Sequence, residues 1–341
     1  MRLTAKLRHS LALPATAGLT ALLITAVAAP ASADTSTVRN TAFQANTGHL
    51  FLYFPGNNGH TDTGLGMAGG TSPSYAGTPS SGDAVAFHAN TGHLWFYTAT
   101  NAGNRDTGLG MAGGTSPSMV PVSPGFEMAF QAANTGHLWI RFTSNNSNFD
   151  TGLGMAAGTS PSVAPILNGE EVAFQANTGH LWIHVQSNNT NIDTGLGMAA
   201  GTSPAIVDSP SGAEVAFHGN NGHLWIYTAT NAGHRDTGLG MAGGTSPSIA
   251  QNNQGGNAVA FQASNGHLWF YTATNAGQRD TGLGMAGGTS PSITALLGSN
   301  NGFGIAFQAD TGHLWIRNAL DNSNRDSGLG MAGGTSPSTL L

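Results

Sequence analysis

Two short phrases that carry acid–base or metal-binding side chains recur along the sequence. G-H-L and D-T-G each occur at a near-constant step, and the last D-T-G copy reads D-S-G. The histidines of the first phrase are His49, His93, His137, His180, His223, His267 and His313. The aspartates of the second phrase are Asp62, Asp106, Asp150, Asp193, Asp236, Asp280 and Asp326. Paired D-T-G loops could supply two carboxylates that share a proton, and histidines are common zinc ligands.

The repetition argues against both kinds of active site. Zinc needs its ligands within about 2.1 Å of one ion, whereas equivalent side chains on neighbouring packed sheets are about 10 Å apart. His88 and His93 share one hairpin, as do His218 and His223, but neither pair has a third ligand nearby. The G-T-S-P phrase lacks the closing Gly of the nucleophile elbow, and Ala205 replaces the serine that follows it in one copy. The sequence therefore predicts no catalytic residue, no metal ion and no cofactor.

The same residues have a structural interpretation. Each Asp is placed to form an Asx turn or to cap the Thr-Gly amides that follow it. Each G-H-L histidine is expected to hydrogen-bond across its own repeat or to line a groove between repeats. We therefore expect these phrases to shape the fold and not to perform catalysis.

The sequence after residue 33 is built from one repeated unit. Successive G-H-L copies are 43 to 46 residues apart, and G-L-G-M-A followed by G-T-S-P completes each unit. Each unit reads as four short strands rich in aromatic and β-branched residues, separated by Gly, Asn and Pro. Four strands per unit, repeated seven times, are typical of an all-β, seven-bladed β-propeller. A β-solenoid is the alternative, but its end repeats are usually atypical.

The hairpin inside each unit has a predictable register. The N-T-G turn at 46–48 suits a type I turn with Gly in the left-handed conformation, which gives a G1-bulge hairpin. This register pairs Phe43 with Phe51 in the first unit and Phe87 with Trp95 in the second. Cross-strand aromatic pairs of this kind contribute roughly 0.2–1 kcal/mol each.

The two ends of the repeat array indicate how the ring closes. The array begins at the second strand of a unit, 38–45, and ends on a first-strand phrase, 335–341. The C-terminal strand should therefore pair into the first blade and close the ring. The blades are expected at 38–70 plus 335–341, 71–114, 115–158, 159–201, 202–244, 245–288 and 289–334, in one domain spanning 34–341.

The N-terminal segment has the layout of a secretory signal peptide. Residues 1–9 are basic, an apolar run covers 11–29, and the A-S-A phrase at 31–33 is a cleavage site. A membrane anchor is the alternative, but Pro14 and Gly18 interrupt the run. Residues 1–33 are therefore predicted to be a signal peptide and the protein to be secreted, with no membrane span.

Composition narrows the classes of partner. From residue 34 onward the chain has seven arginines, no lysine and 16 acidic residues, a net charge of −9. Nucleic acid is therefore an unfavourable partner, because phosphate binding needs dense positive charge. The chain has no cysteine, so packing and backbone hydrogen bonds must stabilise the fold without disulfides.

Repeated aromatic and amide side chains favour multivalent binding of sugars. Sugars need an apolar platform for their C–H face together with neutral hydrogen-bonding groups. The candidate platforms are Trp95, Trp139, Trp182, Trp225, Trp269 and Trp315, with Phe51 in the first copy. The candidate polar groups on the preceding strand are Gln44, His88, Gln131, Gln175, His218, Gln262 and Gln308. The alternative is that each Trp only packs one blade against another.

Differences between the units suggest which sites bind best. The residue before the D-T-G aspartate is Arg105, Arg235, Arg279 or Arg325 in four units, and Thr61, Phe149 or Ile192 in the other three. An arginine fork can donate two hydrogen bonds to vicinal hydroxyls. The units that also carry Tyr97, Tyr227 or Tyr271 are the second, fifth and sixth, and these are predicted to hold the best sites. The predicted carbohydrate-binding residues are the six tryptophans with His93, His223, His267, Arg105, Arg235 and Arg279.

The repeated phrase A-V-A-F-Q-A-N-T-G-H-L-W, with D-T-G-L-G-M-A-G-G-T-S-P-S further on, resembles the blades of PLL-like seven-bladed β-propeller lectins. The resemblance covers 38–341 and extends to exported actinobacterial proteins. It implies binding of fucose-like or other monosaccharides in grooves between blades, at several sites per ring. It also implies an alternative role, as the targeting subunit of a secreted antibacterial toxin particle that binds a protein partner.

Overall fold

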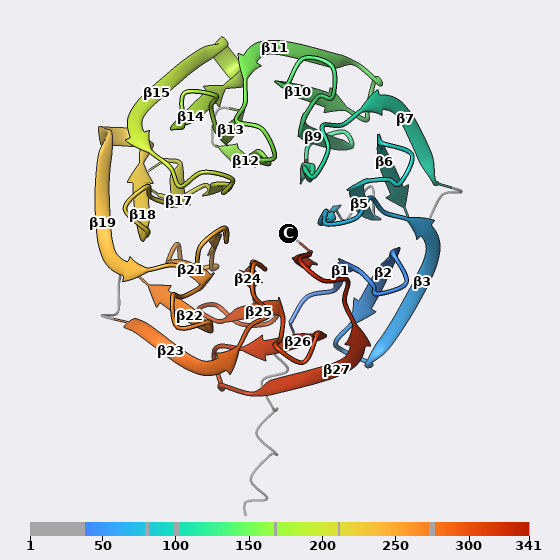
Figure 1. Ribbon diagram of the computed structural model, residues 1–341, viewed down its shortest axis with the longest axis vertical. Coiled ribbons are helices and arrows are strands. Elements are labelled where there is room, and N and C mark those ends of the chain that lie inside the picture. The colour runs from blue at the N-terminus through green and yellow to red at the C-terminus, as the bar shows by residue number, and fades with distance from the viewer. Residues whose placement is uncertain are drawn as a thin grey trace, which may run out of the picture. The chain divides into compact units, whose positions relative to one another are not determined.

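Seven four-stranded antiparallel sheets surround a central axis (Figure 1). The computed structural model describes residues 38–78, 82–98, 103–166, 169–210, 212–272 and 277–340. The predicted all-β, seven-bladed propeller is confirmed. The expected signal peptide at 1–33 lies outside the described residues, as does Leu341.

The strands follow the same order in every blade, from the axis outward. Blade 1 contains β28 (Ser338–Thr339), β1 (Thr41–Gln44), β2 (His49–Phe54) and β3 (Gly59–Gly66). Blade 2 contains β4 (Ser74–Thr78), β5 (Gly82–His88), β6 (His93–Thr98) and β7 (Arg105–Gly110). Blade 3 contains β8 (Ser118–Pro121), β9 (Phe126–Gln131), β10 (His137–Phe142) and β11 (Asn148–Gly154). Blade 4 contains β12 (Ser162–Ile166), β13 (Gly169–Gln175), β14 (His180–Val185) and β15 (Thr190–Gly197).

The remaining three blades repeat this pattern. Blade 5 contains β16 (Ala205–Val207), β17 (Glu214–His218), β18 (His223–Thr228) and β19 (Gly233–Gly240). Blade 6 contains β20 (Ser248–Gln251), β21 (Asn257–Gln262), β22 (His267–Thr272) and β23 (Gly277–Gly284). Blade 7 contains β24 (Ser292–Ala295), β25 (Phe303–Gln308), β26 (His313–Asn318) and β27 (Asn324–Gly330). The short 3₁₀ turns η1 (Gln186–Asn188) and η2 (Ala229–Asn231) connect the third and fourth strands of blades 4 and 5.

The C-terminal strand closes the ring, as predicted. Thr339 on β28 pairs with Thr41 on β1, and the Leu340 amide donates to the Asn40 carbonyl at 2.8 Å. Blade 1 is therefore assembled from both ends of the repeat array. β28 covers the inner edge of β1, so closure protects β1 from pairing with another chain.

The predicted hairpin register is also confirmed. Phe43 pairs with Phe51 and Phe87 with Trp95. Gly48 has a φ of +81°, and its amide donates to the carbonyl three residues earlier at 2.8 Å. Only a residue that tolerates the left-handed region closes this turn without strain.

The hydrophobic core is divided into seven clusters, each lying between two neighbouring blades. Leu50 and Met67 of blade 1, for example, pack against Phe87 and Val85 of blade 2. Because every blade faces two neighbours, the second strands are buried on both sides. Six or more apolar side chains per interface hold adjacent sheets together by hydrophobic burial.

Serine hydroxyls add a ring of hydrogen bonds around the axis. The amide of the G-T-S-P serine in each blade donates to the hydroxyl of the same serine in the next blade, at 2.9 Å. The ring runs through Ser72, Ser116, Ser160, Ser203, Ser246, Ser290 and Ser336. A second set joins each first-strand amide to the serine of the preceding blade, as from Met119 to Ser74 at 2.9 Å. One bond of that second set is missing, because Ala205 has no hydroxyl to accept a hydrogen bond from the first-strand amide of the next blade.

Candidate functional site

The seven histidines of G-H-L pair with the seven aspartates of D-T-G or D-S-G within each blade. The His Nδ1 and a carboxylate oxygen are 3.0–3.1 Å apart in every blade. The same carboxylate accepts the amide of the glycine two residues later, at 2.8 Å for Asp62 and Gly64. The expected Asx turn and the expected cross-blade histidine bond are therefore both present.

A bulge in the outer strand brings each pair together. His49 is opposite Gly66 and Phe51 is opposite Asp62. Residues 63–65 of β3 therefore lie opposite the single residue Leu50. The Thr63 hydroxyl fills this gap by donating to the Leu50 carbonyl at 2.8 Å. Each phrase D-T-G-L-G thus builds a local turn that fixes the carboxylate beside the imidazole.

Hydrogen bonding stabilises the charged form of these aspartates. The Gly64 amide lowers the pKa of Asp62 most, and burial opposes that effect. At Asp236, burial again opposes the shift, but the Gly238 amide, His223 and Asn221 together lower the pKa. Asp62 and Asp236 are therefore ionised acceptors, unlike a proton-sharing dyad, in which one carboxyl has a raised pKa. Among the residues that the structure describes, no group of three His, Cys, Asp or Glu side chains could hold a metal ion.

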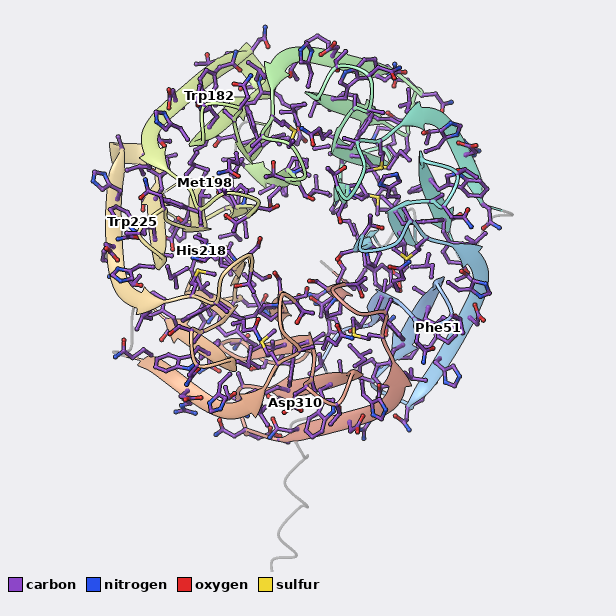
Figure 2. All side chains as sticks on the ribbon, viewed as in Figure 1. Phe51, Trp182, Met198, His218, Trp225 and Asp310 are labelled. Carbon is purple, nitrogen blue, oxygen red and sulfur yellow. The ribbon has the colours of Figure 1, made fainter. Side chains whose placement is uncertain are left out.

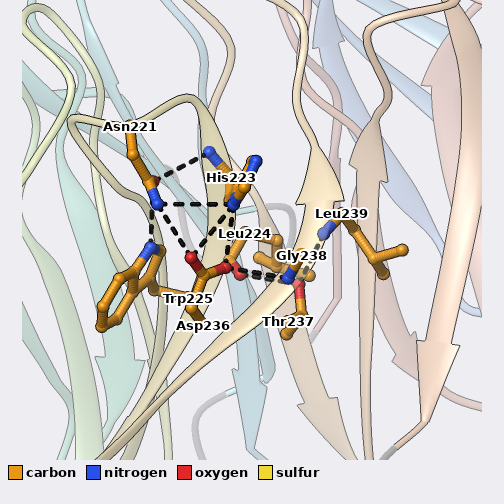
Figure 3. A network of polar contacts seen from close by, with 8 residues as sticks. All are labelled: Asn221, His223, Leu224, Trp225, Asp236, Thr237, Gly238 and Leu239. Carbon is orange, nitrogen blue, oxygen red and sulfur yellow. Dashed lines mark hydrogen bonds and ion pairs between the residues drawn. The ribbon is translucent and has the colours of Figure 1, made fainter.

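Figure 3 shows this network in blade 5, where it extends to a tryptophan. Asn221 donates to Asp236 at 2.8 Å and accepts the Trp225 indole N–H at 3.0 Å. Trp225 also stacks on His234, with 5.9 Å between ring centroids and 20° between the planes. The hairpin tip of this blade therefore joins an indole, an amide, an imidazole and a carboxylate.

The six predicted tryptophans pack within their own blades and against the clusters that these share with the preceding blades. Each contacts the phenylalanine opposite it, with ring centroids 6.2–6.4 Å apart. The indole nitrogens of Trp139, Trp182, Trp269 and Trp315 are buried and have no protein hydrogen-bond partner. Figure 2 shows Trp182 and Trp225 nearer the rim of the ring than Met198 and His218. The tryptophans thus have a packing role, and none lines the two cavities between blades described below.

The polar residues at the end of the second strands are not available to a sugar, which corrects the sequence interpretation. Gln44 is 2% exposed and donates to the carbonyls of Met67 and Ala68. His88 is 3% exposed and bonds the Thr115 carbonyl at 3.0 Å. These side chains satisfy buried backbone carbonyls of the segment that leads to the next blade. Repetition alone could not distinguish this internal role from ligand binding.

The arginines that precede D-T-G reach across to the next blade. The Arg235 guanidinium lies over the ring of Tyr271 and bonds its hydroxyl. Arg279 donates to Asn322 at 2.8 Å, and Arg325 donates to the Pro55 carbonyl at 2.9 Å. Arg235 and Tyr227 belong to one repeat in the sequence, but Arg235 pairs with Tyr271 of the next repeat.

Alternation along the third strand explains this exchange of partners. Trp269 packs into the cluster between blades 5 and 6, whereas Phe270 packs into the cluster between blades 6 and 7. Arg279 is directly opposite Phe270 and points to the same interface. Trp269 and Arg279 therefore face different interfaces, and the groove between blades 6 and 7 combines Arg279 with Phe303 of the next blade.

Two cavities lie at equivalent interfaces and both contain this arginine. A cavity of about 470 Å³ between blades 6 and 7 is lined by Arg279, Phe270, Phe303 and Asn301, among others. A cavity of about 400 Å³ between blades 7 and 1 is lined by Arg325, with other residues that include Asn318, Asn324, Asp321 and Pro55. A third cavity of about 310 Å³ lies around the axis and is mostly apolar, with Arg39, Asp208 and Gln251 on its wall.

Comparison with known proteins gives similarity at the level of the fold. No protein-family model and no curated protein sequence matches the chain. The Aleuria aurantia lectin, solved as a mutant with Fucα1-6GlcNAc, aligns with a TM-score of 0.51 and 11% identity over 76% of this chain and 96% of the lectin. A Niastella koreensis GH74 enzyme aligns with a TM-score of 0.51 and 12% identity, over 88% of this chain and 43% of the enzyme. A puromycin hydrolase mutant complexed with PGG aligns with a TM-score of 0.53 and 12% identity, over 86% of this chain and 52% of the hydrolase.

These similarities establish the β-propeller fold. Function must be inferred from the site itself, because both lectins and enzymes share this architecture. The fungal lectin is a six-bladed propeller, one blade fewer than the ring described above. Within the described part of the chain, no helix has the length and apolar character needed to cross a membrane.

Proposed function

We propose that this chain is a secreted, non-catalytic and multivalent glycan-binding protein whose sugar sites are the grooves between blades. The observation that carries the proposal is the pair of equivalent cavities lined by Arg279 and Arg325. Each has the size of a small-molecule site. The two cavities lie at successive interfaces between blades. This agrees with one kind of binding site that is repeated around the ring.

The lining of the larger cavity suits a sugar ring. Arg279 offers a planar fork that can bond two adjacent hydroxyls. Asn301 and Asn257 add donors and acceptors, and Phe270 supplies an apolar surface for the C–H face. This combination of one aromatic surface with several neutral polar groups matches the chemistry of a monosaccharide. Support from the fungal fucose-binding propeller is limited to its shared architecture.

A ring with several similar grooves would bind weakly at each site and strongly to dense glycans. Linked sites on one rigid body raise the overall affinity by about 10²–10⁴ over a single site when all can engage together. We expect free monosaccharides, fucose-like ones included, to bind at more than one site per chain.

A glycan array followed by monosaccharide inhibition tests the proposal. Binding that free sugar abolishes supports the lectin function. Arg105→Ala, Arg235→Ala and Arg279→Ala combined should weaken binding without lowering the melting temperature by more than a few degrees. Thr61→Ala, at the equivalent position of blade 1, is the matched control. Unchanged binding by a folded triple variant would indicate that sugars bind instead at the hairpin ends that carry the tryptophans and the G-H-L histidines.

A glycan array with no binding would favour the alternative function, a targeting subunit in a secreted antibacterial toxin particle. In that case a protein that co-purifies with the chain from its own culture medium is the expected partner. Export itself is tested by N-terminal sequencing of the protein in that medium, which should begin at residue 34 if residues 1–33 are a signal peptide.

A further inference from the structure

Two arginines from different blades meet at the interface of blades 6 and 7. Arg279 on β23 and Arg317 on β26 both donate to the side-chain oxygen of Asn322, at 2.8 and 2.7 Å. Arg317 also donates to Asn324 at 2.9 Å. Two positive groups thus converge on a neutral amide oxygen, where a carboxylate would be the usual partner.

No carboxylate of the described residues balances this charge by direct contact. Every ion pair within 4.0 Å in that part of the chain joins a histidine to an aspartate. Arg317 is only 5% exposed, and its Nε–H is buried without a partner. Burial first and the nearby Arg279 second lower the pKa of Arg317, while Asp321 opposes them from a distance. Burying a guanidinium without a paired anion is unfavourable.

A second pair of arginines, Arg105 and Arg141, lies at the interface of blades 2 and 3. Arg141 occupies the position of Arg317, donates to Asn146 and has a buried Nε–H without a partner. Burial and the charge of Arg105 lower the pKa of Arg141. The corresponding residues of the other five blades are Tyr53, Tyr97, His184, Tyr227 and Tyr271. The arginine pair is therefore specific to two of the seven interfaces.

The larger inter-blade cavity opens beside the pair at blades 6 and 7. Arg279 is the only charged residue among those that line it, and no Asp or Glu is present in that set. Asn252, Asn257 and Asn301 supply neutral hydrogen-bonding groups, and Phe270 supplies an aromatic surface. In a chain that is acidic overall, this cavity is a local site of positive potential.

We propose that the groove between blades 6 and 7 binds a carboxylated sugar, with Arg279 pairing its carboxylate and the asparagines bonding its hydroxyls. The inference rests on the proposed glycan-binding function and specifies the sugar class at this groove. A planar guanidinium holds a carboxylate through two parallel hydrogen bonds. Arg317 acts behind it as a second positive charge that the ligand compensates. We expect the interface of blades 2 and 3, where Arg105 lies near the buried Arg141, to bind the same class of sugar.

Titration with two sugars that differ in one group tests this inference on the unmodified protein. Methyl β-D-glucuronide carries a carboxylate where methyl β-D-glucoside carries a hydroxymethyl group. We expect the glucuronide to bind about tenfold tighter or more, with a stoichiometry of two and an affinity that falls as salt is added. Equal affinity for the two glycosides would overturn the inference while leaving the proposed lectin function standing. If no neutral or acidic glycan bound, both the inference and the proposed lectin function would be contradicted.

Variants then locate the site. Arg279→Gln should reduce the glucuronide stoichiometry to one, and Arg105→Gln with Arg279→Gln should abolish the carboxylate preference. Gln278→Ala, an exposed neighbour on the same strand, is the matched control and should retain it. A melting curve for each variant confirms folding. Retention of the preference by a folded double variant would overturn the assignment, as would complete displacement of the glucuronide by an equal concentration of sodium acetate.

Discussion

The guanidinium of Arg235 lies over the ring of Tyr271 in the next blade, with 5.5 Å from its Cζ to the ring centroid. The same arginine bonds the tyrosine hydroxyl. These two residues are 36 positions apart in the sequence and join at an interface near the rim. The contact therefore ties adjacent blades together in addition to any part it has in binding.

A double-mutant cycle measures this contact. Arg235→Ala, Tyr271→Leu and their combination should give a coupling free energy of about 0.5–1 kcal/mol, the range for an exposed cation–aromatic pair. Chemical denaturation supplies the values. Arg105→Ala is the comparison, because Arg105 faces Arg141 and its removal relieves repulsion instead of losing attraction. A coupling of zero would show that the contact adds nothing to the interface.

Ala205→Ser should stabilise the fold. Ala205 is the one position that interrupts the second set of serine hydrogen bonds, and a hydroxyl there could accept the bond from blade 6. The expected gain in unfolding free energy is about 0.5–1.5 kcal/mol. Ser248→Ala removes the equivalent bond to Ile293, which is 3.1 Å long, and should destabilise by a similar amount. Unfolding midpoints that move in the same direction for both variants would contradict this explanation.

Glu127→Gln should alter how stability depends on pH. Burial raises the pKa of Glu127 to about 7, with Gln186 opposing and Glu170 adding to the shift. Between the unfolded value near pH 4.5 and about pH 7, the folded protein keeps a proton that the unfolded chain has lost. Stability therefore falls as pH rises through that window.

Replacing the carboxyl with an amide removes this loss. The variant should be more stable than the parent at pH 8, by on the order of 2 kcal/mol, and little changed at pH 5. Thermal melting at both pH values provides the measurement. Asp310→Asn is the control, because Asp310 is exposed and four other blades carry Asn there. An equal shift at the two pH values would mean that titration of Glu127 is not the cause.

Gly219→Ala should move the Trp225 ring. Gly219 stands where the other six blades carry Ala, and an added Cβ would lie 2.5 Å from Trp225 Cδ1 and 2.6 Å from its Nε1. We expect the indole to leave its stack on His234 and to lose its bond to Asn221. Stability should change by less than about 1 kcal/mol, because six blades accommodate the alanine. An indole N–H resonance that keeps its position in the NMR spectrum would contradict this.

Removal of residues 338–341 should lower stability by several kcal/mol. The deletion unpairs β28 from β1 and exposes a strand edge at the axis. Thermal and denaturant unfolding of the truncated and full chains provide the comparison. A chain that ends at 337 and melts together with the full protein would rule out closure as a major source of stability.

Much of the fold follows from the sequence because the repeat is regular. Seven copies of the same strand and turn signals determine the number of blades, and the N-T-G turn determines the register of Phe43 with Phe51. The phase of the two ends predicts that β28 joins blade 1. The bulge at Asp62 was not predictable, because it depends on how Thr63 fills the gap opposite Leu50.

The candidate site was harder to predict, because it lies between repeats. A single repeat does not show that Arg235 would contact Tyr271 and not Tyr227, since this depends on which face of the strand each residue occupies. The roles of Gln44 and His88 were also hidden, because a buried amide and a ligand-binding amide look alike in sequence. The Arg141 and Arg317 substitutions at a position usually held by Tyr are the signal that could have revealed the charged grooves.

The bond between Ser336 and Ser72 joins residues 264 positions apart, and this separation has a consequence for biosynthesis. During synthesis, blades 2 to 7 can form in order, but blade 1 lacks its inner strand until residues 338–339 have been made. A chain truncated before residue 338 would leave the inner edge of β1 unpaired. Such a product would present an open strand edge to proteases and to other chains, so protection of blade 1 depends on synthesis through residue 339.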